Sequence, residues 1–207
     1  MLLGNPQGWG NLMTARVLLL RHAQTSAPDV FHGAESDIGL GERGREQARA
    51  VADRIASFLP AAVYSSAMRR ARETAQPIAS ACGLSPIAIA SLHERKMGAL
   101  SGTPWAESRP IYDETMRRWT AGDLDSSHEG GESYAQIRDR VVPELLAISS
   151  RHDGQTVVVV AHGVVIRVLL TSLVAGLGPA DLRALPIEFV GIHDLRRDRD
   201  RWSLGGP

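Results

Sequence analysis

Residues 16–22 read RVLLLRH, a short aliphatic run that ends on His22. Residues 157–163 read VVVVAHG, and this second run ends in the same way on His162. Aliphatic runs of this length predict buried parallel strands. In open α/β sheets, ligands bind at the carboxyl ends of the strands. We therefore expect both histidines to lie at one ligand-binding edge of a sheet.

The rest of the sequence alternates strand and helix patterns. Apolar residues at spacings of three and four predict the helices, and short apolar runs predict the strands. The expected strands are 16–20, 61–64, 86–90, 156–161 and 188–195, and the expected helices are 42–59, 66–81, 133–148 and 164–175. This alternation indicates an α/β fold, a single-domain three-layer α/β/α sandwich with a mostly parallel central sheet.

Local signals mark the ends of several of these elements. The serines at 65–66 are typical N-cap residues and predict the start of helix 66–81. Pro77 is expected to kink that helix or to remove one hydrogen bond from it. Residues 133–136 have the spacing of a capping box. Charges of alternating sign at 196–201 predict a solvated hairpin or tail.

Composition places the chain among globular proteins that carry no large net charge. Of its 207 residues, 43% are hydrophobic, and 23 basic residues balance 23 acidic ones, so neither nucleic acid nor a membrane surface is an expected partner. Residues 1–14 predict a flexible tail before a domain at 15–207, with no signal peptide. Cys82 is the single cysteine, which excludes a disulfide framework and a thiolate zinc site. We expect a cytoplasmic protein, and a homodimer is left open.

Four segments that follow the first four strands carry a family resemblance. They read RHAQT (21–25), YSSAMRRARETA (64–75), LHERKMGALSG (92–102) and VAHGVVIR (160–167). Together they resemble the histidine phosphatase superfamily, also called phosphoglycerate-mutase-like. LGERGREQA (40–48) and GGES (130–133) resemble the starts of two of its helices. The resemblance extends from about Arg16 to Leu195.

The resemblance implies a catalytic role for five residues. His22 would be the nucleophile and become a phosphohistidine, and the flanking Arg21 would disfavour its protonation. Arg21, Arg70 and His162 would surround the transferring phosphoryl group, whose charge calls for fixed cations and donors. Glu94 would protonate the leaving oxygen. Substrate contacts are expected from Arg21, Gln24, Thr25, Arg70, Glu94 and Gly163, and no cofactor is implied.

The sequence departs from the family after the nucleophile. The family commonly has glycine at the position of Ala23 and asparagine at that of Pro28. Ala23 is tolerable if its φ angle is negative, whereas Pro28 removes a backbone amide that could contact phosphate. His22, His162 and Glu94 could instead bind a metal ion, but the two arginines beside them oppose a dication. The remaining histidines are expected to be surface or structural.

Residues 98–130 interrupt the alternation and predict an irregular lid insertion. Three aromatic residues, Trp105, Tyr112 and Trp119, need something to pack on, which favours an ordered segment. Because the catalytic groups would contact only the phosphoryl group, substrate specificity is expected from the insertion. The candidates are Trp105, Arg109, Tyr112, Arg117 and Arg118.

Three functions follow from these residues. The favoured one is hydrolysis of a small phosphomonoester by a metal-independent phosphatase. The alternative is a phosphoglycerate mutase of the 2,3-bisphosphoglycerate-dependent type. A mutase must exclude water while its bisphosphate intermediate reorients, and the short segment from Glu94 to His162 offers little cover for this. The third is a module that binds phosphorylated ligands without catalysis, which would not need both a nucleophile and an acid.

Overall fold

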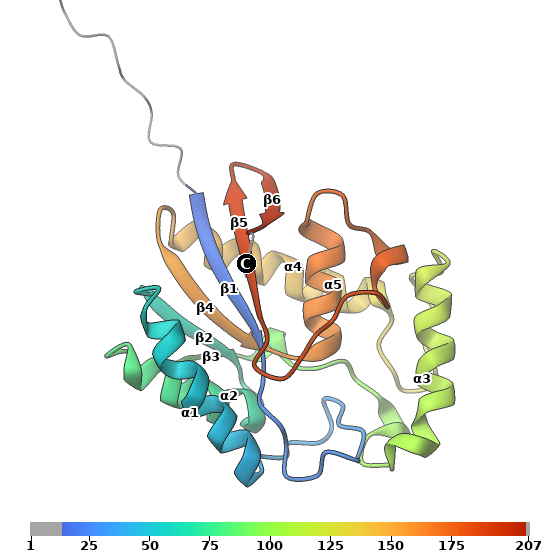
Figure 1. Ribbon diagram of the computed structural model, residues 1–207. Helices are drawn as coiled ribbons and strands as arrows, with labels where there is room; N and C mark the ends of the chain where they lie inside the picture. Colours follow the sequence, from blue (N-terminus) through green and yellow to red (C-terminus); the bar gives the residue numbers. More distant parts are fainter. Residues whose placement is uncertain (1–13, 206–207) are drawn as a thin grey trace, which may run out of the picture.

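The central sheet has six strands and places both histidine-ending runs side by side. The computed structural model describes residues 14–205 (Figure 1). The strand order is β3-β2-β4-β1-β5-β6. The first four strands in this order are parallel, and β5 and β6 add an antiparallel hairpin. The strands are β1 (Thr14–Arg21), β2 (Ala62–Ser66), β3 (Ile87–Ile89), β4 (Thr156–Ala161), β5 (Ile192–Asp198) and β6 (Arg201–Leu204).

Helices cover both faces of the sheet, as the alternation predicts. Side chains alternate between the faces along a strand, so Leu18 and Leu20 of β1 face one layer and Val17 and Leu19 the other. The first layer holds α1 (Glu42–Ala56) and α2 (Arg69–Ala81), and the second holds α4 (Tyr134–Arg151) and α5 (Gly163–Leu173) (Figure 1). The expected three-layer α/β/α fold is confirmed.

Several element ends differ from the prediction. The serines at 65–66 are the last residues of β2, and Met68 is the N-cap of α2. Both serines are fully buried, and the Ser66 hydroxyl accepts a hydrogen bond from the amide of Met68, so Ser66 contacts the helix start from the end of the strand without being the N-cap. The capping box at 133–136 and the position of Pro77 inside α2 are confirmed. The charged run 196–201 forms the hairpin between β5 and β6.

The insertion is not irregular, which corrects the prediction for 98–130. It contains α3 (Trp105–Thr120), which lies at the side of the sandwich (Figure 1). Prolines disfavour helix interiors, but here Pro104 is the N-cap of α3 and Pro110 is accommodated within the helix. The buried face of α3 has helical spacing and ends on the fully buried Trp119.

Residues 1–13 of the expected tail lie outside the described residues, and Thr14 is the first residue of β1. None of the helices within residues 14–205 combines the length and the apolar character that a bilayer span requires.

Gly44 in α1 packs directly on the loop that follows β1. A Cβ built on Gly44 would lie well inside contact distance of the Gln24 carbonyl oxygen. Because this neighbour is backbone, Gly44→Ala must push α1 away from the loop. We expect urea unfolding to show a loss of about 1–3 kcal/mol in the free energy of unfolding. The variant should also lose part of its activity. Gly178→Ala is the matched control, since a Cβ there meets nothing within 4 Å; equal stability of both variants would contradict the prediction.

Candidate active site

His22 and His162 meet at the carboxyl ends of the two central strands. Arg21 at the end of β1 pairs with Ala161 at the end of β4, so each histidine is the next residue. Their ring centroids are 5.2 Å apart. His22 is buried at 6% exposure and His162 completely. The expected juxtaposition of the two imidazoles is thus confirmed.

The surroundings of His22 select one tautomer. Its Nδ1 lies 2.7 Å from the carbonyl oxygen of Ala23, which can only accept, so Nδ1 carries the proton. The lone pair is then on Nε2. The amide of Ala23 donates to Thr74 Oγ1 at 3.0 Å, which fixes the loop. Ala23 is not among the non-glycine residues with positive φ, so the condition for tolerating it is met.

Burial holds both imidazoles neutral. The pKa of His22 lies well below its usual value, first because of burial and then because of the charges of Arg70 and Arg21. The pKa of His162 is lowered by burial and by Arg70. The direction predicted for His22 is correct, but Arg21 is not the main cause. A neutral histidine with a free Nε2 lone pair is a competent nucleophile.

Two buried arginines lie beside the histidines and keep unused donors. Arg21 donates from Nη1 to the Ile187 carbonyl at 2.9 Å, and its guanidinium carbon lies 4.0 Å from the centroid of the Phe189 ring. Arg70 donates to the Ser36 carbonyl at 2.8 Å. Within residues 14–205, the Nε atoms of both arginines and both ring nitrogens of His162 are buried without a hydrogen-bond partner. The two arginine Nε–H groups and the one N–H of the neutral His162 ring suit an anion with several acceptor oxygens.

Glu94 reaches the same place from the segment after β3. One of its carboxylate oxygens accepts from the amide of Arg95 at 2.8 Å, and the other from the amide of Val164 at 3.4 Å. Val164 lies in the first turn of α5, so the carboxyl group sits at the amino end of that helix, directly after His162.

A cavity of about 470 Å³ opens onto these groups. Five of the expected site residues line it: Arg21, His22, Thr25, Glu94 and Gly163. Arg70 and His162 are not in the lining and lie buried behind it, close enough for Arg70 to lower the pKa of both histidines. Gln24 is not among the lining residues, and its backbone amide donates to Gln47 Oε1 at 2.9 Å.

An aromatic wall faces the catalytic groups across the cavity. Phe31 stacks on Trp105 with ring centroids 4.9 Å apart, and Tyr112 packs against both. Backbone hydrogen bonds join the two segments: the Phe31 amide donates to Thr103, and the Trp105 amide to Asp29. Trp105 and Tyr112 were expected at the substrate, and the structure places both in the lining.

Sequence reasoning missed several lining residues, among them Phe31, His32, Arg167 and Phe189. His32 was expected at the surface or in a structural role. Arg167 lies one helical turn after Gly163, and this spacing could have revealed it. Phe189 stands in a loop whose next residue, Val190, has φ +51°, a strained angle for a β-branched residue. No sequence signal predicts that conformation.

The arginines of α3 do not reach the cavity, which corrects their expected role. Arg117 pairs with Glu114 and Arg109 with Asp113 on the exposed face of α3, and Arg118 pairs with Asp123, which follows the helix. Exposed pairs of this kind contribute little to stability.

We therefore expect the double variant Arg117→Ala/Arg118→Ala to keep the wild-type KM within about twofold for every hydrolysed substrate, because neither side chain lines the cavity. Initial-rate kinetics check this. A KM at least tenfold higher for one substrate only would return these arginines to the binding site.

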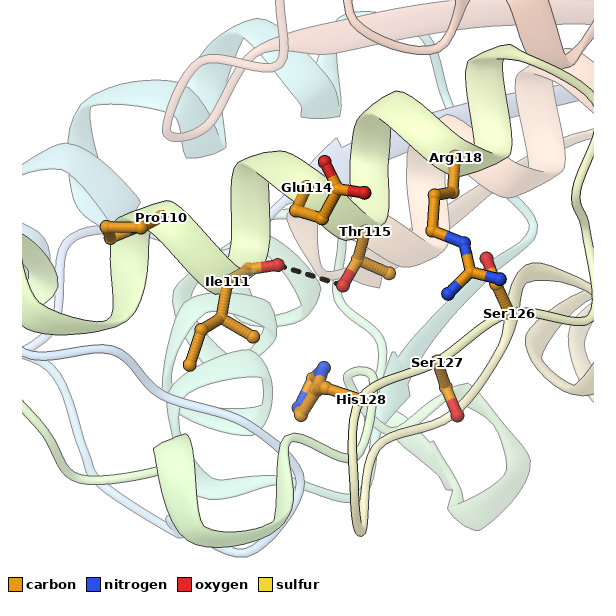
Figure 2. A pocket seen from close by; sticks show the side chains of 8 residues that line it. All are labelled: Pro110, Ile111, Glu114, Thr115, Arg118, Ser126, Ser127 and His128. Atoms are coloured by element: carbon orange, nitrogen blue, oxygen red, sulfur yellow. Dashed lines mark hydrogen bonds between the residues drawn. The ribbon is translucent and has the colours of Figure 1, made fainter.

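A second cavity of about 350 Å³ lies between α3 and residues 126–128 (Figure 2). Figure 2 shows Arg118 and His128 among its lining side chains, but none of the catalytic candidates. His128 Nε2 donates to the Met97 carbonyl and its Nδ1 accepts from Arg95, so this histidine is structural, as expected.

Comparison with known proteins gives consistent matches over nearly the whole chain. The model of the histidine phosphatase superfamily (branch 1) matches residues 17–206. A metal-independent phosphoserine phosphatase of Arabidopsis thaliana is 33% identical over 90% of this chain and 80% of its own length. Phosphoglycerate mutase-like protein 4 of the same plant is 34% identical over 92% and 83%. The structure of a mycobacterial glucosyl-3-phosphoglycerate phosphatase is 29% identical, covers 92% of this chain and 97% of its own, and superposes with a TM-score of 0.77.

Proposed function

The chain belongs to the histidine phosphatase superfamily and is a phosphatase that works through a phosphohistidine, and we propose that His22 is the residue phosphorylated. The observation that carries this assignment is the tautomer of His22: Nδ1 is held by the Ala23 carbonyl, and Nε2 keeps its lone pair in the cavity wall. The substrate is a small phosphomonoester.

Two displacements complete the proposed reaction. In the first, Nε2 of His22 attacks phosphorus, the bond to the ester oxygen breaks, and Glu94 gives its proton to the departing alkoxide. In the second, water attacks the phosphohistidine, Glu94 accepts a proton from that water, and inorganic phosphate leaves. His22 returns to its starting state, so the atoms and charges balance over the cycle.

Arg21, Arg70 and His162 stabilise the transferring phosphoryl group in this proposal. Its transition state carries charge on three equatorial oxygens. The unused donors of the two arginines and the single N–H of the neutral His162 ring supply hydrogen bonds to those oxygens. Because the side chains supply the positive charge, the reaction has no step that needs a metal ion.

The test is a panel of phosphomonoesters assayed with and without EDTA. We expect hydrolysis at equal rates in both conditions, and transient labelling of the protein by ³²P-substrate in an acid-labile form. Loss of the rate in EDTA, or an enzyme that never carries the label, would overturn the mechanism.

A mutase is the second candidate, because two kinds of relative carry that name. Incubation with 3-phosphoglycerate, followed by ³¹P NMR, separates the two functions. Hydrolysis releases inorganic phosphate. Accumulation of 2-phosphoglycerate ahead of inorganic phosphate would favour the mutase.

A further inference from the structure

A third arginine at the cavity has no role in the phosphoryl chemistry. Arg167 lines the cavity from α5. A Cβ built on Gly163 would lie 3.6 Å from Arg21 Nε and 3.7 Å from Arg167 Nη1, so the two guanidinium groups flank this glycine. Arg167 itself makes only long contacts, at 3.5 Å to the Gly163 carbonyl and 3.3 Å to that of Leu185. Within residues 14–205 it has no carboxylate partner.

The charges at the cavity do not balance with a phosphoryl group alone. The charged lining residues are Arg21, Arg167 and Glu94, and Arg70 adds a positive charge from behind. A phosphoryl dianion offsets Arg21 and Arg70. When Glu94 is protonated to act as the acid, the charge of Arg167 has no counterpart. Arg167 also lowers the pKa of Arg21, so the two cations repel each other. A second anionic group on the substrate relieves this repulsion.

The position of Arg167 indicates which part of the substrate it meets. Arg167 lines the same cavity as Arg21 and the wall residues Trp105 and Tyr112. Because it flanks Gly163 beside Arg21, it adjoins the phosphoryl site within the space open to the leaving group. The cavity of about 470 Å³ has room for a leaving group beyond the phosphoryl group.

We propose that Arg167 binds a carboxylate on the leaving group, so that the enzyme selects phosphomonoesters of small hydroxy acids. This rests on the proposed function and names its substrate class. The planar guanidinium fork matches the two oxygens of a carboxylate. Larger substituents on the hydroxy acid lie against Trp105, a residue of the aromatic wall that lines the cavity and is 37% exposed.

Matched substrates that differ by the carboxylate test the proposal. Phosphoserine is compared with phosphoethanolamine, and 3-phosphoglycerate with glycerol 3-phosphate. We expect the wild type to favour the carboxylate compound in each pair by at least tenfold in kcat/KM. Arg167→Ala should remove most of that preference, with a loss of about 10- to 100-fold on the carboxylate compounds, mainly through KM. Arg167→Lys should restore part of the preference, and Arg118→Ala, the exposed control, should keep all of it.

The outcomes separate this proposal from the proposed function. Equal kcat/KM within each pair in the wild type would overturn the carboxylate site, while continued hydrolysis of p-nitrophenyl phosphate would leave the phosphatase standing. Equal losses on both members in Arg167→Ala would make Arg167 structural. Arg167→Met keeps the aliphatic stem and decides the matter if the alanine variant unfolds. Failure to hydrolyse p-nitrophenyl phosphate would instead remove the proposed function.

Discussion

Replacing His22 by alanine is expected to abolish turnover, with a loss of at least about 10⁴-fold in kcat. No other side chain at the cavity presents a neutral imidazole with its Nδ1 proton held by a carbonyl and its Nε2 free. His32 bonds through both ring nitrogens, to Ser36 and Ala27, so it cannot substitute without leaving those contacts. The fold should persist, because the His22 side chain makes one hydrogen bond, to the Ala23 carbonyl, and lines the cavity rather than filling the core.

The decisive measurement is the phosphoenzyme. The wild type should carry acid-labile ³²P during turnover, and His22→Ala should carry none while showing a native circular dichroism spectrum. His152→Ala is the matched control. That residue ends α4 and bonds Tyr64 and Gln155, and it does not line the cavity. Label on His22→Ala, or full activity in that variant, would refute the assignment.

Glu94→Gln is expected to lower kcat by about 10²- to 10⁴-fold for substrates with alkyl leaving groups. Glutamine can still accept a hydrogen bond from the amide of Arg95 or Val164, so the side chain stays in place. What it cannot do is give a proton to the leaving oxygen. The loss should be much smaller for p-nitrophenyl phosphate, because nitrophenolate leaves without a proton.

The contrast between leaving groups distinguishes an acid from a positioning residue. Glu114→Gln serves as the control, since Glu114 pairs with Arg117 on the exposed face of α3. If Glu94→Gln loses the same factor on both substrate types, Glu94 binds substrate or holds the loop, and the general acid must be sought elsewhere.

Sequence patterns predict the sheet and the two histidines well because both depend on local signals. The valines of β4 and the leucines of β1 are buried on both faces, and a run of this kind has few other structures open to it. The histidines follow directly, since neighbouring parallel strands end at the same edge. Glu94 likewise stands at the end of a short segment that follows β3.

Where packing decides, the patterns mislead. Ser65 and Ser66 have the chemistry of N-caps, but complete burial in β2 overrides that preference. Pro110 suggests a break, yet the fully buried Trp119 and its bond to the Ser126 carbonyl hold α3 together. Arg117 and Phe189 show the same limit at the cavity. The rotation of α3 about its axis keeps Arg117 out of the lining, and Phe189 lines the cavity beside the strained backbone of Val190. The spacing of residues in the sequence reveals neither the rotation nor the strain.

The place of β1 in the sheet has a consequence for how the protein is made. β1 leaves the ribosome before the other strands of this sheet, but its two neighbours, β4 and β5, are encoded far downstream of it. Arg16, for example, pairs with Asp194, 178 residues later. At typical rates of synthesis, this strand waits on the order of ten seconds for a partner. Nascent chains that stop before β4 therefore expose an apolar strand, and we expect chaperones to bind there while the catalytic centre is still incomplete.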